Sequence, residues 1–147
     1  MKIYKNAFTM IELVFVIVVL GILSAIAIPK FSATRVDAQI TKGRSDISAI
    51  RSAIVSERQS RLIKGDSSWI SSLSGASSNY FDGNDTNHSL LMYGIKPKDA
   101  NGHWYDWNSD EHTYKFKIED NDNVFTYNPD KGTFLCTSGD RCSDLTD

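Results

Sequence analysis

The stretch KNAFTMIELVFVIVVLGILSAIAIPKF, residues 5–31, decides what kind of molecule this chain is. Phe8 to Ile28 spans 21 residues, nearly all of them apolar. As an α-helix this segment is about 31 Å long, enough to cross a hydrocarbon core of about 30 Å. Lys2 and Lys5 precede it, which favours an N-terminus in the cytoplasm and a C-terminal region on the other side of the membrane. We therefore predict one membrane-spanning helix at the start of the chain.

One carboxylate, Glu12, lies near the start of this apolar segment. A charged side chain within a bilayer costs roughly 2.5–3.5 kcal/mol, and a plain membrane anchor gives no reason to bear that cost. A secretory signal peptide cut after Ala25-Ile26-Ala27 is another interpretation, although the uncharged run of residues 13–28 is longer than the usual hydrophobic region. A glutamate that extends from the membrane surface toward water is a further interpretation.

The residues AFTMIEL, 7–13, followed by a long apolar helix, resemble the prepilin signature of type IV pilins and type II secretion pseudopilins. The resemblance covers about the first 60 residues. It implies that a prepilin peptidase cuts between Ala7 and Phe8 and methylates the new amine of Phe8. It also implies that Glu12 registers an incoming subunit against the terminal amine of a docked neighbour. The usual residue before the cut is glycine, and this chain has Ala7 instead.

The chemistry of Glu12 supports that role independently. Cleavage before Phe8 creates a cationic amine one helical turn from the Glu12 carboxylate. An anion in a low-dielectric setting is tolerated when it meets a cation, so a pair between neighbouring molecules lowers the cost for both groups.

The helix is predicted to continue beyond the membrane segment, to about Lys64, with Gly65 as its cap. Pro29 removes a backbone donor, so a kink is expected there, and Gly21 adds local flexibility. In the family that this chain resembles, such a Gly–Pro pair marks the stretch that unwinds when subunits pack together. An apolar stripe at steps of three and four follows, which predicts one buried side, packed on a sheet of the same molecule or in a coiled coil. The stripe consists of Ala33, Val36, Ile40, Gly43, Ile47, Ile50 and Ile54.

The remaining residues are predicted to form a polar head. Residues 65–89 are rich in Ser, Gly, Asn and Asp and predict a long variable loop, which Trp69, Tyr80 and Phe81 attach to the core. Residues 112–119, HTYKFKIE, alternate like a half-buried strand. NDN, residues 121–123, is expected to turn the chain, and a hairpin through residues 128–132 follows, with a possible earlier strand in GHWYDW.

The predicted fold class is therefore α+β, with a long N-terminal helix packed on a small antiparallel sheet, as in pilins. The predicted regions are a leader at residues 1–7, a membrane and filament-core helix at 8–29, its amphipathic half at 30–64, the loop at 65–89 and the sheet head at 90–147.

Two cysteines, Cys136 and Cys142, lie close together near the C-terminus. A pair of cysteines beyond a membrane-directing segment predicts a disulfide in an oxidising compartment, with reduced thiols or half of a zinc site as the alternatives. Charge is also divided along the chain. Residues 30–64 hold eight basic and three acidic residues, and residues 65–147 hold six basic and fourteen acidic ones. Copies of such a molecule could attract one another side by side, or both faces could simply be solvated.

No catalytic motif is apparent, so we expect a structural protein and no enzyme. No cofactor and no metal are expected; calcium is the alternative, because acidic side chains supply hard oxygen ligands. The candidate ligands are Asp106, Asp110, Glu111, Asp120 and Asp122. Direct nucleic-acid binding is not expected of a head with a net negative charge, because binding to phosphates requires Lys and Arg residues opposite them.

The resemblance implies a structural subunit of a filament assembled at the bacterial inner membrane. It would be a single-pass protein with a cytoplasmic N-terminus and a periplasmic head. Its partners would be copies of itself, related pilins, a prepilin peptidase, and an inner-membrane platform with its ATPase. A type II secretion pseudopilin is the first choice, because the compact head with few strands resembles the major subunit. A type IV pilin, including one for DNA uptake, is the alternative, and a membrane-anchored periplasmic binding domain is an alternative of a different class.

Overall fold

The computed structural model describes residues 8–75, 78–83 and 89–146. The chain divides into two compact units, residues 1–35 and 36–147. The main helix, α1, spans Met10–Ile63 and therefore has residues in both units. It is followed by β1 (Trp104–Asn108), β2 (Thr113–Ile118), β3 (Asn121–Asn128), β4 (Thr133–Ser138) and a short helix, α2 (Cys142–Thr146). The predicted α+β architecture, a long N-terminal helix with an antiparallel sheet, is confirmed.

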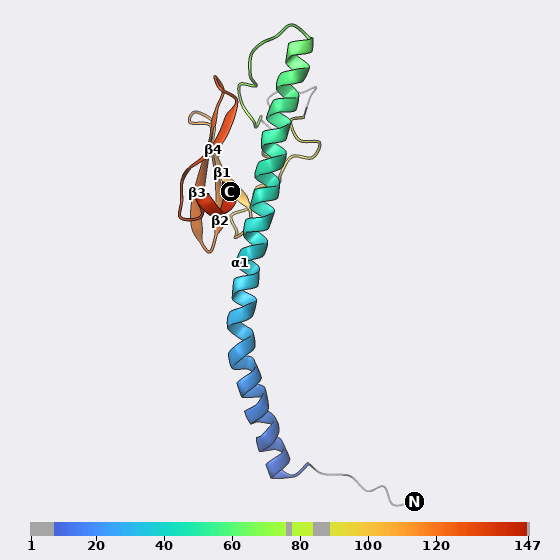
Figure 1. Ribbon diagram of the computed structural model, residues 1–147, viewed down its shortest axis with the longest axis vertical. Helices are drawn as coiled ribbons and strands as arrows, with labels where there is room; N and C mark the ends of the chain where they lie inside the picture. Colours follow the sequence, from blue (N-terminus) through green and yellow to red (C-terminus); the bar gives the residue numbers. More distant parts are fainter. Residues whose placement is uncertain (1–7, 76–77, 84–88, 147) are drawn as a thin grey trace, which may run out of the picture. The chain divides into compact units, whose positions relative to one another are not determined.

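The four strands form one antiparallel sheet in the order β1-β2-β3-β4. Alternation decides which side of the sheet is buried, because successive side chains of a strand point to opposite faces. In β2, Tyr114, Phe116 and Ile118 are fully buried, and the residues between them are partly exposed. Within residues 36–147, α1 runs along one side of this sheet (Figure 1).

The apolar stripe of α1 supplies the helix side of the core. Ile47, Ile50 and Ile54 are buried in one cluster with the aromatic side chains of the sheet, and Val36 and Ile40 pack against that cluster. The predicted packing of the helix on a sheet is thereby confirmed for these residues. Ala33, the first member of the predicted stripe, is exposed and lies in the other unit.

Gly65 ends α1 as predicted. Its φ is +85°, and its N–H donates to the carbonyl of Leu62 at 3.0 Å, while the N–H of Asp66 donates to the carbonyl of Arg61 at 2.9 Å. This pair of bonds is the Schellman arrangement, in which a residue in the left-handed region closes the last turn. The loop that follows is held by Phe81, which is fully buried, and by Trp69 and Tyr80, which pack against the core.

The expected turn at residues 121–123 is wrong. These residues belong to β3 and pair with Ile118, Lys117 and Phe116 of β2. The turn consists of Glu119 and Asp120, which have φ values of 50° and 62°. Two successive residues with positive φ form the tight hairpin turn whose twist matches that of the strands. Asn and Asp residues at 121–123 favour a turn. The pairing of β2 with β3 extends through these residues, however, and leaves only two residues, Glu119 and Asp120, to connect the strands.

Asn123 is of a residue type that favours turns, yet it lies inside β3, where its side chain makes specific hydrogen bonds. Its side chain is completely buried. The amide donates to the carbonyl of Phe116 at 3.3 Å, and the amide oxygen accepts the N–H of Arg141 at 3.0 Å. A buried polar side chain is tolerated when its hydrogen bonds are made, so Asn123 joins the sheet to the segment that leads into α2.

Candidate functional site

The first turn of α1 brings Thr9 and Glu12 together. The hydroxyl of Thr9 accepts the backbone N–H of Glu12 at 3.3 Å, and the carbonyl of Thr9 accepts the N–H of Leu13 at 3.2 Å. Thr9 is thus the N-cap, and Glu12 occupies the third helical position, where an acidic residue also suits the helix dipole. Sequence reasoning missed the role of Thr9, although Thr-x-x-Glu ahead of an apolar run is the sequence pattern of a capping box.

The apolar side chains of the helix behind Glu12 are exposed in the part of the chain that the structure describes. Every Phe, Met, Ile, Leu and Val side chain from Phe8 to Ile28 is at least 37% exposed, and Phe8 itself is 77% exposed. Among the described residues, α1 is the one helix long and apolar enough to cross a membrane. A continuous apolar surface of this size marks contact with lipid or with other proteins.

The remaining predicted residues of this segment are only partly described. Ala7, the residue before the predicted cut, lies outside the described residues, and Phe8 is the first residue within them. Gly21 and Pro29 both lie inside α1, which is helical through both positions. A Cβ added at Gly21 would have no atom within 4 Å. Unwinding at this pair during assembly stays a prediction.

The predicted disulfide is present. Cys136 of β4 and Cys142, the first residue of α2, are bonded, with their Cα atoms 5.6 Å apart. The bond holds α2 beside the edge of the sheet. Leu145 of α2 is buried in the core. The backbone carbonyl of Asp144 accepts the Nε–H of Arg44 at 2.5 Å.

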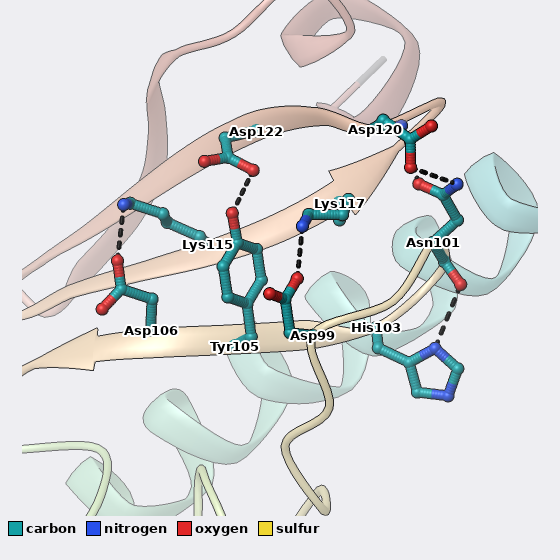
Figure 2. Close-up of polar contacts among 9 residues, drawn as sticks. All are labelled: Asp99, Asn101, His103, Tyr105, Asp106, Lys115, Lys117, Asp120 and Asp122. Carbon is teal, nitrogen blue, oxygen red and sulfur yellow. Dashed lines mark hydrogen bonds and ion pairs between the residues drawn. The ribbon is translucent and has the colours of Figure 1, made fainter.

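Two of the five calcium candidates, Asp106 and Asp122, belong to a polar patch on the side of the sheet that faces away from the core. Here Tyr105 donates its hydroxyl hydrogen to the Asp122 carboxylate, and Lys115 pairs with Asp106 at 2.5 Å (Figure 2). Lys117 pairs with Asp99. The ammonium nitrogens of the two lysines lie 6.0 and 4.6 Å from the centre of the Tyr105 ring. We call this set the outer charged face: Asp99, Tyr105, Asp106, Lys115, Lys117 and Asp122.

The carboxylates of the outer charged face have protein partners. Hydrogen bonding to Asp106 raises the pKa of Lys115, and the bond to Asp99 raises the pKa of Lys117. Burial of its ring and the hydrogen bond to Asp122 raise the pKa of Tyr105. Each ion pair thus favours the charged form of its lysine, and Tyr105 keeps its proton.

The other calcium candidates lie in turns. Asp120 accepts the side-chain amide of Asn101 at 3.0 Å (Figure 2). The backbone N–H groups of Asp110 and Glu111 donate to the side chain of Asn108 at 3.0 and 3.3 Å. Within residues 8–75, 78–83 and 89–146, no three His, Cys, Asp or Glu side chains are grouped as a metal site requires. The structure therefore does not bring the five candidates together.

Comparison with known proteins agrees with the geometry of the N-terminal segment. The family model for the prokaryotic N-terminal methylation motif matches residues 3–28. The chain carries the prokaryotic N-terminal methylation motif. This match confirms the resemblance to type IV pilins and pseudopilins that the sequence indicated. It covers Ala7, Phe8, Glu12 and Gly21, and ends just before Pro29.

Two fimbrial proteins of Pseudomonas aeruginosa are similar to this chain. Each is 41% identical over 49 residues, which are 33% of this chain and 32% of the relative. The chain thus spans about a third of the length of the curated relatives that it matches. No solved structure matches. Together with the methylation motif and the α+β fold, the likeness makes the chain type IV pilin-like.

Proposed function

We propose that this protein is a structural subunit of a helical filament that assembles from the bacterial inner membrane. The observation that carries the proposal is the exposed apolar helix of a methylation motif with a single carboxylate, Glu12, in its first turn. The helix is held in the membrane before assembly and lies in the filament core afterwards. In this proposal the protein functions by assembling into a filament, and this function requires no catalytic site.

The domains follow from this role. Residues 1–7 are the leader, 8–29 the membrane and filament-core helix, 30–64 its amphipathic half, 65–89 a variable loop and 90–147 the periplasmic head. A prepilin peptidase cuts between Ala7 and Phe8 and methylates Phe8. An inner-membrane platform with its ATPase then adds the subunit to copies of itself or to related pilins.

Glu12 has two roles that can be separated by experiment. Within its own helix, the backbone N–H of Glu12 donates to the Thr9 hydroxyl, and this bond does not depend on the side chain, so glutamine keeps it. As the partner of a neighbour's Phe8 amine it needs a negative charge, because the amine is a cation. The bond to Thr9 stabilises one subunit, and the pairing role joins two.

The Glu12→Gln variant tests the assembly role. We expect it to be cut at Phe8 and to remain in the membrane, with filaments reduced at least tenfold because the ion pair between neighbours is lost. Mass spectrometry of the N-terminal peptide reports cleavage and methylation, and electron microscopy of sheared filaments reports assembly. Thr9→Ala, which removes the capping hydroxyl and keeps the charge, is the matched control and should still form filaments. Normal filaments from Glu12→Gln would contradict the pairing role.

The filament that we favour is a type II secretion pseudopilus, because the head is compact and its sheet has four strands. A type IV pilus, including one for DNA uptake, is the second candidate. It is favoured by the C-terminal disulfide and by the likeness to fimbrial proteins. Deleting the gene distinguishes the two: loss of protein secretion with intact surface pili supports the pseudopilus, and loss of surface pili supports the pilus. A membrane-anchored binding domain would show neither loss and would form no filaments.

A further inference from the structure

Arg58, near the end of α1, forms no ion pair with the residues that the structure describes. Its Nη1 atom is buried and makes no hydrogen bond. None of the hydrogen bonds or ion pairs seen within residues 8–75, 78–83 and 89–146 involves its guanidinium. The two carboxylates that lie nearest in the sequence are used elsewhere: Glu57 and Asp66 both pair with Arg61, at 2.9 and 3.5 Å. A buried charged donor without a partner is costly, so its retention calls for an explanation.

The guanidinium of Arg58 is held in a fixed orientation. Its Cζ atom lies 4.7 Å from the centre of the Trp69 ring, a stacked cation–π arrangement. Trp69 in turn lies directly against Gly132 of the turn between β3 and β4, where a Cβ would come within 2.2 Å of the ring. Stacking against a fixed ring removes the freedom that an arginine side chain normally loses when it binds a ligand.

Arg58 lines an open recess between the end of α1, the following loop and the turn between β3 and β4. The recess is polar, and its lining includes three serine residues and one carboxylate. Its other lining residues are Ser67, Ser68, Trp69, Ser71, Pro129 and Asp130. The planar fork of a guanidinium matches a carboxylate in a bidentate fashion, and the hydroxyl of Ser67 belongs to the same lining. The chemistry of the recess therefore suits an oxyanion.

Two carboxylates near Arg58 affect which oxyanion the recess would bind. Asp130 lines the recess, and Asp66 is close enough to Arg58 that the guanidinium helps to hold the pKa of its carboxyl low, after the hydrogen bonds from Ser68. Two neighbouring anions repel a doubly charged phosphate more strongly than a singly charged carboxylate. From the unpartnered guanidinium and the serine-lined recess, we propose that the Arg58–Trp69 recess is a binding site for a carboxylate. The group belongs either to a small acid or to an acidic side chain of another copy of the chain.

Fluorine NMR of the full chain in detergent micelles tests this site. Labelling with 5-fluorotryptophan gives a signal for each of Trp69, Trp104 and Trp107, and Trp69→Phe assigns the first. We expect sodium acetate to shift the Trp69 signal saturably and to leave the other two unchanged. Sodium chloride at equal ionic strength should cause no shift, and phosphate should bind more weakly than acetate. An equal response to chloride, or a stronger response to phosphate, would overturn the proposal.

Variants of Arg58 make the test specific. Arg58→Gln should weaken acetate binding about tenfold or more, since a charge-assisted bidentate pair is lost. Arg58→Lys keeps the charge and loses the planar fork, and should also bind more weakly. Lys64→Gln removes an exposed cation outside the recess and is the matched control, with unchanged binding. The Trp104 and Trp107 signals report whether each variant remains folded. Unchanged binding by both Arg58 variants would exclude the site.

The same signal identifies the source of the carboxylate. If an acidic side chain of another copy binds, the Trp69 signal should shift as the protein concentration rises. That shift should disappear with added acetate and in Arg58→Gln. If a small acid is the ligand, the signal should respond to acetate and be independent of protein concentration. Both readouts are made on solubilised subunits, so they do not depend on whether filaments form.

Discussion

Gly43 is the residue of α1 against which the C-terminal helix, α2, packs most closely. A Cβ at this position would lie 2.6 Å from Cδ2 of Leu145 and 2.8 Å from Cε1 of Phe116. Both neighbours are buried, and their side chains belong to α2 and β2. The absence of a side chain on the helix therefore makes room for two others, and α2 docks directly over the backbone of α1.

Gly43→Ala should destabilise the head even though alanine is the better helix former. The intrinsic gain is about 1 kcal/mol, whereas forcing a methyl group into a packed core costs roughly 1–3 kcal/mol, and here two side chains must move. We expect a lower midpoint in urea unfolding of the full chain in micelles, followed by the near-UV circular dichroism of the aromatic core. Gly21→Ala, with open space around the added methyl, should not lower it. A Gly43→Ala protein as stable as the parent would contradict the close packing.

Single residues show what sequence reasoning could and could not reach. Glu12 was recognisable because a charge in an apolar segment demands a reason. Asn123 was not, because Asn normally signals a turn, and its burial depends on hydrogen bonds to Phe116 and Arg141 that only the folded chain brings together. Arg58 was also missed, since its lack of a partner results from the competition of Arg61 for both nearby carboxylates.

At the scale of elements, regular patterns were predictable and exact boundaries were not. The alternation in β2 and the three-and-four spacing of α1 specify which side of each element is buried, and both predictions are confirmed. The turn between β2 and β3 was misplaced because glutamate, unlike Asn and Asp, seldom adopts positive φ, and Glu119 does so here. Their conformation is supported by contacts made elsewhere: Asp120 with Asn101 and Glu119 with Arg141.

The end of α1 offers a test at this scale. Gly65→Ala places a side chain at φ +85° with no atom within 4 Å of the new methyl, so its effect comes from the backbone alone. We expect a loss of about 1 kcal/mol in the free energy of unfolding, measured with urea, because L-residues are disfavoured in the left-handed region. Gly65→Asn should lose less, since asparagine tolerates this region better. Equal losses in the two variants would argue against the Schellman cap.

At the scale of the whole molecule, the two units obtain their stability in different ways. Residues 8–35 have apolar side chains that remain exposed in the isolated chain and therefore depend on lipid or neighbours. Residues 36–147 have a core of their own, closed by the Cys136–Cys142 bond. Composition and periodicity predict an apolar segment at residues 8–29 and an amphipathic one from residue 30, whereas the structure divides the chain after Arg35.

The disulfide should contribute measurably to the second unit. Closing a short loop restricts the unfolded chain, and by the loop-entropy relation the contribution is about 2–3 kcal/mol. The Cys136→Ser/Cys142→Ser variant should unfold at a correspondingly lower urea concentration, and so should the parent after reduction. Dithiothreitol should not affect the double variant, which controls for other actions of the reductant. If reduction leaves the midpoint of the parent unchanged, the bond does not stabilise the head.

The outer charged face has a consequence for how copies of this protein meet. A sheet whose free side is flat and apolar can stack on another sheet and aggregate, and natural proteins prevent this with charges. Here, Lys115 and Lys117 project from one strand, and Asp99, Asp106 and Asp122 neutralise them within the same molecule. These charged groups already have partners in their own molecule, so they offer few new interactions to a second sheet. Removing water from them to pack a second sheet on this face would also cost free energy. A molecule that we propose polymerises through its helix is thereby protected from polymerising through its sheet.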